Sequence, residues 1–171
     1  MGAQRTRQTE RSAWTSSIAL DDSGHPHIAY SLHLTNEDHR YRIASWDGAR
    51  WIDREVAFAG HCLYNTQTSY TGLITLDPAD PTTAVISTNV DPSTGEDTGG
   101  RHEVYRAQIG RGDETRSIQW TPMTRNSPVR NLRPVIVRHG DTRVIAWLRG
   151  DFVSYHDYQL DVVGLVKRAS N

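Results

Sequence analysis

The chain has 171 residues, of which 36% are hydrophobic and 23% are charged, as in one globular domain or part of a larger one. Its formal net charge is −1, which excludes the strong positive charge typical of proteins that bind nucleic acids or anionic membranes. Almost all of the positive charge comes from arginine, whose guanidinium group binds carboxylates and phosphates through paired hydrogen bonds.

Three further features concern the compartment. The chain has a single cysteine, Cys62, so it forms no intrachain disulfide. No apolar run reaches the length of a membrane-spanning helix, and the N-terminal stretch MGAQRTRQTERSAW lacks the apolar core of a secretory signal. We therefore expect neither nucleic acid nor a membrane as a partner, and the residues alone leave the localisation open.

Short apolar runs separated by Asp, Gly, Pro and Asn turns predict an all-β fold. The Asp47-Gly48 pair lies between two such runs and predicts a hairpin. Strands are expected over residues 14–20, 25–32, 39–46, 50–56, 70–76, 82–88, 101–109, 116–122, 132–138, 142–148, 152–158 and 159–167.

The predicted strands form three similar blocks. The LD of WTSSIALDD matches the LD of GLITLDP, and the repeat period is about 55–60 residues. Three units of four strands predict blades of a β-propeller over 14–56, 69–122 and 132–167, and a twelve-stranded β-sandwich is the alternative.

Known propellers have about four to eight blades. We therefore expect residues 1–171 to form a partial propeller, completed by further blades or by oligomerisation. Residues 1–13 are expected to form a poorly ordered N-terminal segment.

The longer loops predict the position of a binding face. In a four-stranded blade, the loop after the second strand and the link to the next blade lie at the same end. These segments are the longer and chemically richer ones here, and scaffolds carry function on such loops. The stretch GHPHIAYSLH shows the distinction, because His25 and His27 lie at the end with tight turns and His33 lies at the other.

Several stretches resemble the BNR-repeat (Asp-box-related) propeller family, and more specifically the C-terminal half of its polysaccharide lyases, which act on uronate-containing glycans such as ulvan. The resemblance covers nearly the whole chain, in IALDDSGHPHIAYS, LYNTQTSYTGLITLDPADPTTAVISTNVDPSTGE, RHEVYRA, TPMTRNSPVRNLRPVI and IAWLRGDFVSYHDYQLDVVGLV. Worn Asp-box motifs remain in WDGARW and RGDETRSIQW. The resemblance implies a seven-bladed propeller, an acidic polysaccharide or oligosaccharide as partner, and secretion or a periplasmic location.

A lyase of this kind works by β-elimination. A base removes the proton at C5 of the uronate, an acid protonates the leaving oxygen, and a cation neutralises the carboxylate. The expected catalytic residues are His33, His61 and Tyr70, and the expected substrate-binding residues are Tyr64, Arg101, His102, Arg133 and Arg149.

The chain departs from the lyase pattern at one catalytic position. Leu32-His33 stands where such a lyase has a His-His pair at the end of the second strand, and this chain alone is expected to be inactive. One alternative is a non-catalytic glycan-binding or interaction propeller. Another is a sialidase-like glycoside hydrolase, because Glu103 and Tyr105 share one side of a predicted strand, although no Asp partner is apparent.

No cofactor is expected. Asp91, Glu96 and Asp97 share one loop with Gly and Thr and offer oxygen ligands for a structural calcium ion, but their spacing fits no defined calcium loop. His25 and His27 lie on one side of a strand without an evident third ligand. We therefore predict no metal site and keep structural calcium as an alternative.

Overall fold

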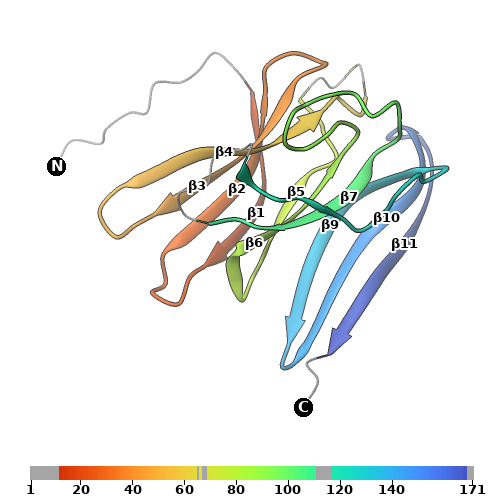
Figure 1. Cartoon of the computed structure of the whole chain (residues 1–171). Coiled ribbons are helices and arrows are strands. Elements are labelled where there is room, and N and C mark those ends of the chain that lie inside the picture. The colour runs from red at the N-terminus through yellow and green to blue at the C-terminus, as the bar shows by residue number, and fades with distance from the viewer. Residues whose placement is uncertain (1–11, 65, 67–68, 111–116, 169–171) are drawn as a thin grey trace.

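The computed structural model describes residues 12–64, 66, 69–110 and 117–168, and these residues form β-strands joined by turns and loops, without an α-helix (Figure 1). No helix long and apolar enough to cross a membrane is present in this part of the chain. The strands are β1 (Ala13–Leu20), β2 (Pro26–His33), β3 (His39–Trp46), β4 (Trp51–Gly60), β5 (Ile74–Asp77), β6 (Asp80–Thr88), β7 (Glu103–Gln108), β8 (Thr121–Pro122), β9 (Arg130–His139), β10 (Thr142–Ser154) and β11 (Asp157–Arg168).

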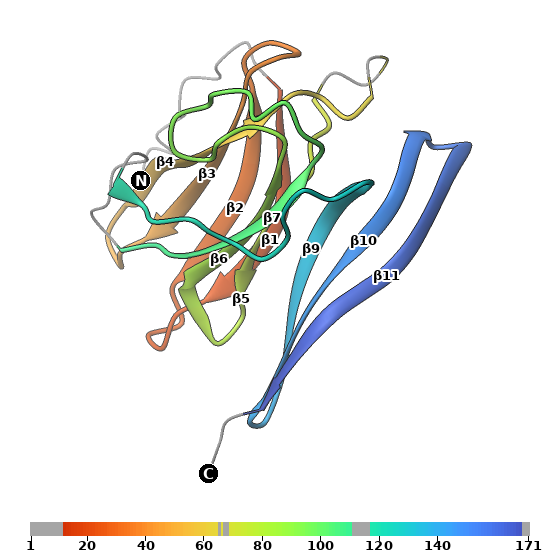
Figure 2. The same cartoon turned by 45° about the vertical axis from the view of Figure 1, so that its right-hand side comes forward.

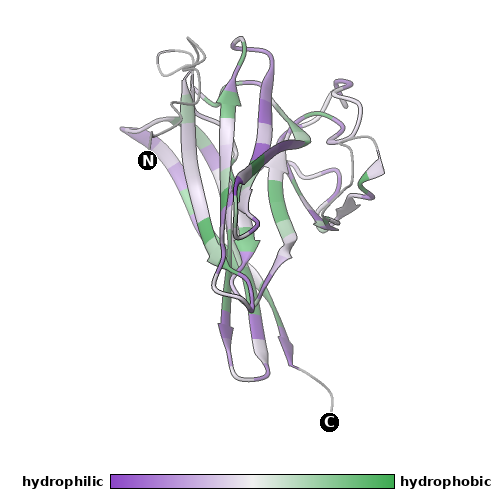
Figure 3. Cartoon of the chain, turned by 90° about the vertical axis from the view of Figure 1, so that its left-hand side faces the viewer, coloured by the Kyte–Doolittle hydropathy of each residue, from purple (hydrophilic) through white to green (hydrophobic). Residues whose placement is uncertain are grey.

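The strands form three antiparallel sheets, and within each sheet every strand pairs with the next one along the chain. The first sheet contains β1–β4, the middle sheet β5–β8 and the third sheet β9–β11. Side chains alternate between buried and less buried positions, most regularly in β2, and hydrophobic and hydrophilic bands follow one another along the strands (Figure 3). The predicted all-β fold with antiparallel sheets is confirmed, and the described residues do not close into a propeller.

The turn at Asp47-Gly48 is confirmed. The N–H of Asp47 donates to the carbonyl of Arg50 (3.1 Å), and the Asp47 carboxylate accepts hydrogen bonds from the N–H groups of Ala49 and Arg50. Gly48 has a φ of +99°, a conformation that a residue with a Cβ rarely adopts.

The third sheet has three strands, so the prediction of four strands in this block is wrong. The predicted turn at Arg149–Asp151 lies inside β10, whose chain reverses only between Ser154 and Asp157. Gly150 has a φ of +148°, and a Cβ at this position would collide with the carbonyl oxygen of Gln159 in β11. The glycine therefore permits the close approach of two strands rather than a turn.

Three predicted strands are shorter than expected. The strand predicted at 116–122 is reduced to Thr121–Pro122, and residue 116 lies outside the described residues. The strand predicted at 70–76 begins at Ile74, because the chain before it forms a link rather than a ladder. The strand predicted at 101–109 covers Glu103–Gln108. Of the N-terminal segment 1–13, only residues 12 and 13 lie within the described part of the chain.

An apolar core joins the first and middle sheets, and we call this contact the first seam. Tyr41 is fully buried and donates its hydroxyl hydrogen bond to the carbonyl of Ser87 in the middle sheet (2.7 Å). The hydroxyl of Ser16 donates to the carbonyl of Ile74 (2.7 Å). The buried cluster consists of Ala19, Ala29, Tyr41, Ile43, Val56, Ala57, Ala59, Ile74, Leu76, Ala84, Ile86, Ala107, Ile109 and Ile118.

The middle and third sheets meet at the second seam, where a smaller apolar cluster contains Val85, Val104, Ile136, Ile145 and Trp147. Figure 2 shows the third sheet standing beside the middle one. Part of this seam is polar, and its polar contacts are of two kinds.

One polar contact is an ion pair at the end of the second seam where the short β5–β6 and β9–β10 turns lie. The carboxylate of Asp77 is fully buried and accepts three hydrogen bonds of 2.7–3.1 Å from the guanidinium of Arg138. Arg143 lies 3.6 Å from the same carboxylate. Burial raises the pKa of Asp77. Arg138, the N–H of Ala79 and Arg143 lower it by more, so the net pKa is below the usual value.

The other polar contact is centred on Asn131, which is fully buried. Its backbone and side-chain N–H groups donate to the carbonyl of His102, and its side-chain oxygen accepts from the indole N–H of Trp147 (2.9 Å). The hydroxyl of Ser87 donates to the Asn131 carbonyl (2.5 Å). Buried backbone and side-chain groups of the two sheets therefore satisfy one another.

Candidate functional site

The long loops gather at one end of the sheets. The N–H of Cys62 donates to the carbonyl of Asn36 (2.8 Å), and the N–H of Phe58 donates to the carbonyl of Pro92 (2.9 Å). The guanidinium of Arg130 donates to the carbonyl of Leu63 (3.3 Å). These contacts join segments from all three sheets, so the chemically rich loops share one end of the molecule.

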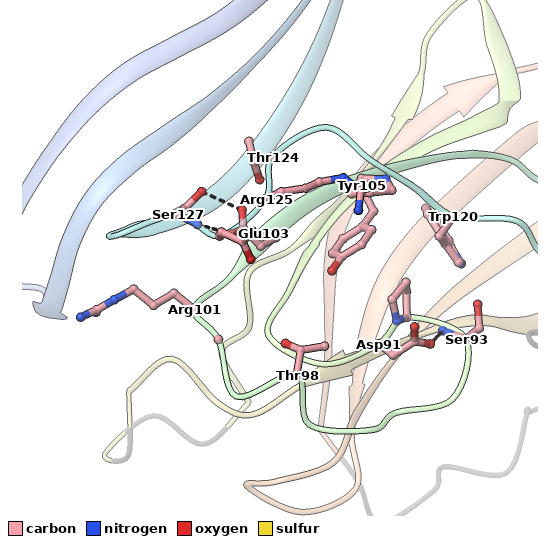
Figure 4. A pocket seen from close by; sticks show the side chains of 14 residues that line it. Asp91, Ser93, Thr98, Arg101, Glu103, Tyr105, Trp120, Thr124, Arg125 and Ser127 are labelled. Carbon is pink, nitrogen blue, oxygen red and sulfur yellow. Dashed lines mark hydrogen bonds between the residues drawn. The ribbon is translucent and has the colours of Figure 1, made fainter.

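A polar pocket of about 410 Å³ lies beside the loop between β6 and β7. Figure 4 shows the side chains around it, with the hydroxyl of Tyr105 pointing into the space that they surround. The pocket is lined by Asp91, Pro92, Ser93, Thr98, Gly100, Arg101, Glu103, Tyr105, Trp120, Pro122, Thr124, Arg125, Asn126 and Ser127.

The two carboxylates of this pocket already accept hydrogen bonds from the protein. Asp91 accepts from the backbone N–H groups of Ser93 and Thr94 (2.8 Å each). Glu103 accepts from the N–H and hydroxyl of Ser127 (2.6 and 2.8 Å) and from the Asn131 amide (3.3 Å). Both carboxylates therefore hold loops in place.

Two aromatic side chains form part of the wall. Tyr105 is half-buried, and burial followed by the charges of Glu103 and Asp91 raises the pKa of its hydroxyl, against the effect of Arg125. The phenol therefore stays protonated at neutral pH and is a hydrogen-bond donor. The indole nitrogen of Trp120 is buried and has no hydrogen-bond partner among the described residues, although its ring packs against the core of the first seam.

Arg101 and Arg125 bring positive charge to this pocket. Both are exposed, and neither guanidinium makes a hydrogen bond or an ion pair with a described residue. Burial and the charge of Arg101 lower the pKa of Arg130, which places a third cation near this end of the pocket. The available donors and the flat rings fit a ligand with both a carboxylate and an apolar face.

The predicted residue His33 lies at the end of β2, next to a histidine that the sequence analysis did not select. Its ring meets the ring of His39 edge to face, with 4.9 Å between centroids, because the two residues are direct partners in the β2–β3 ladder. His39 is fully buried and its Nδ1 lies 3.1 Å from the carbonyl oxygen of Gly60. The Nε2 of His33 lies 3.3 Å from the Asn36 side-chain oxygen.

Of the predicted residues His61 and His102, the first is half-buried and the second is buried. The N–H of His61 donates to the side-chain oxygen of Asn89 (3.0 Å). His102 is 4% exposed, and its Nε2 has no hydrogen-bond partner among the described residues. Burial, with the nearby charges of Arg130 and His61, lowers the pKa of His102 to about 3, so its ring is neutral at neutral pH.

The predicted residues Tyr64, Tyr70 and Arg133 come together, as members of one aromatic cluster. The rings of Tyr64 and Tyr70 each lie 5.7 Å from that of Tyr155, and the Arg133 guanidinium lies 4.9 Å above the Tyr70 ring. Tyr70 is 2% exposed. The cluster borders a hollow of about 320 Å³ that is mostly apolar.

Arg149 and Arg101 complete the predicted set. Arg149 is exposed in β10 and pairs with Asn131 and Asp161 in the neighbouring strands. Arg101 lines the polar pocket. The predicted residues are thus spread over several places at the loop end.

The sequence analysis missed Trp120 and Arg125 and did not place Asp91 beside Tyr105. The pair Glu103 and Tyr105 was visible as alternate residues of one strand, and both line the pocket. The others arrive through loops whose course no short-range pattern encodes.

No group of three or more His, Cys, Asp or Glu side chains able to hold a metal ion occurs in the described part of the chain. In the loop kept as an alternative calcium site, the N–H of Asp91 donates to the carbonyl of Glu96 (2.8 Å), and the Asp97 carboxylate accepts from the N–H of Gly99 (2.8 Å). These contacts shape the loop itself.

None of the family models, curated proteins or solved structures with which we compared the chain matches it.

Proposed function

We propose that the chain is part of a carbohydrate-active β-propeller and that it binds an acidic saccharide in the polar pocket. The observation that carries the proposal is that Arg101, Arg125, Tyr105 and Trp120 line one pocket, and that neither guanidinium forms a hydrogen bond or an ion pair with a described residue. Guanidinium groups bind a sugar carboxylate through paired hydrogen bonds.

The aromatic groups fit the rest of such a ligand. A ring of Tyr or Trp offers an apolar face for the C–H groups of a sugar and a polar tip for its hydroxyls. The protonated hydroxyl of Tyr105 is a donor, and the Trp120 ring adds an apolar wall. The bonded carboxylates of Asp91 and Glu103 keep the walls in position.

The propeller part of the proposal rests on exposed apolar side chains of the first and third sheets. Ile18 and Leu20 of β1 are 64% and 57% exposed, and Val162 and Val166 of β11 are 76% and 64% exposed. Contiguous exposed apolar residues mark surfaces that another element covers. Further sheets, from additional blades or from a second copy of the chain, fit these faces.

The binding proposal is tested by calorimetric titration of the folded chain with uronate-containing oligosaccharides and with neutral ones of the same length. We expect only the acidic set to bind, and Arg101→Gln and Arg125→Gln each to weaken binding about tenfold or more. Tyr105→Phe keeps the ring and is expected to cause a smaller loss. Arg50→Gln is the matched control, because the Arg50 side chain is 79% exposed at the β3–β4 turn.

Two results contradict the proposal. One is the absence of binding to any acidic saccharide while the chain is folded by circular dichroism. The other is binding that Arg101→Gln and Arg125→Gln leave at the level of the Arg50→Gln control.

A sialidase-like hydrolase is the second candidate, because Asp91, Glu103 and Tyr105 line the same pocket. This places an aspartate beside the Glu and Tyr pair. The raised pKa of Tyr105 and the three hydrogen bonds to Glu103 favour binding over nucleophilic attack. Release of a fluorophore from an acidic glycoside, abolished by Tyr105→Phe while binding persists, would favour the hydrolase.

Lyase activity stays a prediction that rests on the resemblance. Its assay is the ultraviolet absorbance of the unsaturated uronate that β-elimination produces. If the chain in a complete propeller shows this activity, His33→Ala, His61→Ala and Tyr70→Phe are expected to reduce it. Binding without any such product would favour the non-catalytic role.

A further inference from the structure

A second opening, which we call the cationic cleft, lies between the middle and third sheets, and its lining residues alternate with those of the polar pocket along β7 and the segment around β8. It has a volume of about 470 Å³ and is bordered by β7, the segment around β8, β10 and β11. Figure 2 shows β9 of the third sheet next to the middle sheet, with β10 and β11 beyond it. Its charged lining residues are Arg106, Arg143 and Lys167.

Arg106 is the residue that most needs a partner. It is partly buried in β7, and its Nε is buried without a hydrogen-bond partner among the described residues. Its guanidinium also makes no ion pair with a described residue. Burial and the neighbouring charge of Arg143 lower the pKa of Arg106. A half-buried cation without an acceptor is unfavourable unless a ligand supplies one.

The charges around Arg106 are not balanced. Arg143 is 15% exposed and lies 3.6 Å from Asp77, whose carboxylate already accepts three hydrogen bonds from Arg138. The other carboxylate near Arg106 is that of Asp80, and its oxygens accept from Thr82, Thr83 and Gln108. Both carboxylates are therefore committed elsewhere.

The remaining lining groups suit an anion as well. Lys167 is the one lysine of the chain, is exposed, and makes no ion pair with a described residue. Gln119 and Thr121 line the same opening and carry amide and hydroxyl donors. Arginine forks bind tetrahedral oxyanions through paired hydrogen bonds.

We propose that the cationic cleft binds a tetrahedral oxyanion, phosphate or sulfate, between Arg106 on the middle sheet and Arg143 and Lys167 on the third sheet. The ion links two sheets through one set of charge-assisted hydrogen bonds. Its source is either the free ion or an ester group on a larger molecule, since both present the same oxygens.

The first experiment titrates the folded chain with inorganic phosphate and with inorganic sulfate by calorimetry at constant ionic strength, with chloride as the reference. We expect saturable binding of one ion per chain. Arg106→Gln and Lys167→Gln are each expected to weaken binding about tenfold, and Arg106→Lys to weaken it less because it keeps the charge but loses the fork. Binding should also raise the unfolding temperature.

Matched variants separate this site from the polar pocket. Arg101→Gln and Arg125→Gln should leave oxyanion binding unchanged, as should Arg50→Gln at the exposed turn. A second titration compares a sulfated saccharide with its desulfated form. Binding of the sulfated form that Arg106→Gln weakens, without binding of the inorganic ions, would assign the site to an ester.

Two outcomes overturn the proposal. The first is no binding of phosphate, sulfate or the sulfated saccharide to the folded chain. The second is binding that Arg106→Gln and Lys167→Gln leave unchanged. Failure of the acidic-saccharide proposal would not affect this one, because the two sites share no residue.

Discussion

The two seams join the same kinds of sheet by different means. The first seam is a broad apolar core in which a few hydroxyl groups satisfy carbonyls across the contact. The second seam has a smaller apolar cluster flanked by the Asp77–Arg138 ion pair and the Asn131 hydrogen-bond network. The first seam therefore depends on burial and shape, and the second on charge and hydrogen bonding.

Because of this difference, buried charged and titratable side chains lie in the second seam. The first seam is mostly apolar, with the buried His27 at the end that carries the tight turns. The second seam contains the neutral His102, the buried carboxylate of Asp77 and the half-buried Arg106. We therefore expect acid to weaken the second seam before the first. The predictions below test this expectation.

Tyr41→Ala should have the largest effect on stability, because Tyr41 is fully buried in the first seam. We expect a loss of about 3–5 kcal/mol in the free energy of unfolding, measured by urea denaturation. Tyr41→Phe removes only the hydroxyl bond to Ser87, and about 1 kcal/mol is expected. Equal losses for the two variants would show that the first seam does not depend on packing.

Asp77→Asn should cost about 3 kcal/mol at neutral pH, because it leaves Arg138 and Arg143 without their buried carboxylate. Since the folded-state pKa of Asp77 is lowered, its contribution is present above the pKa of an unfolded aspartate and is lost as pH falls through the lower folded-state value. As the pH falls from neutral to strong acid, the free energy of unfolding should therefore decrease less for the variant than for the wild type. Parallel pH profiles would contradict this.

His102→Gln should flatten the acid limb of the stability profile. The pKa of His102 is lowered to about 3 from 6.5, so between these values the unfolded chain binds a proton that the folded chain does not. Stability should fall with decreasing pH by up to about 1.4 kcal/mol per pH unit from this group. Unfolding at several pH values measures the slope, with His156→Gln at the exposed β10–β11 turn as control.

Trp147→Phe should cost only about 1 kcal/mol, as Tyr41→Phe does. It keeps an aromatic ring in the second seam but removes the donor to the Asn131 side chain (2.9 Å). Urea denaturation gives the loss in the free energy of unfolding for Trp147→Phe and for Val85→Ala. Comparing the two losses separates the polar from the apolar contribution to the second seam. A loss as large as that of Tyr41→Ala would show that hydrogen bonds and packing contribute alike.

The sequence predicted the fold class because the chain marks most turns with Asp and Gly. The hairpin at Asp47-Gly48 followed from such a signal and is confirmed. The same signal failed at Gly150, where the glycine serves the approach of β10 to β11. A single sequence does not distinguish a glycine that turns the chain from one that lets strands meet.

The site was less predictable for a physical reason. Tyr70 and Arg133 were both selected as candidate site residues, and the structure brings them together. The grouping of Trp120 and Arg125 with Tyr105 depends on the course of long loops. Tertiary contacts such as the bond from Ser127 to Glu103 fix those loops, and no local pattern encodes them.

Ser87 has a mechanical consequence. Its carbonyl accepts from Tyr41 of the first sheet, its hydroxyl donates to the carbonyl of Asn131 of the third, and its N–H donates to the carbonyl of Leu73, just before β5 (3.0 Å). A force that pulls the first sheet away is transmitted to the third through the atoms of one residue. A load on one seam is therefore felt directly at the other, through the hydrogen bonds of Ser87.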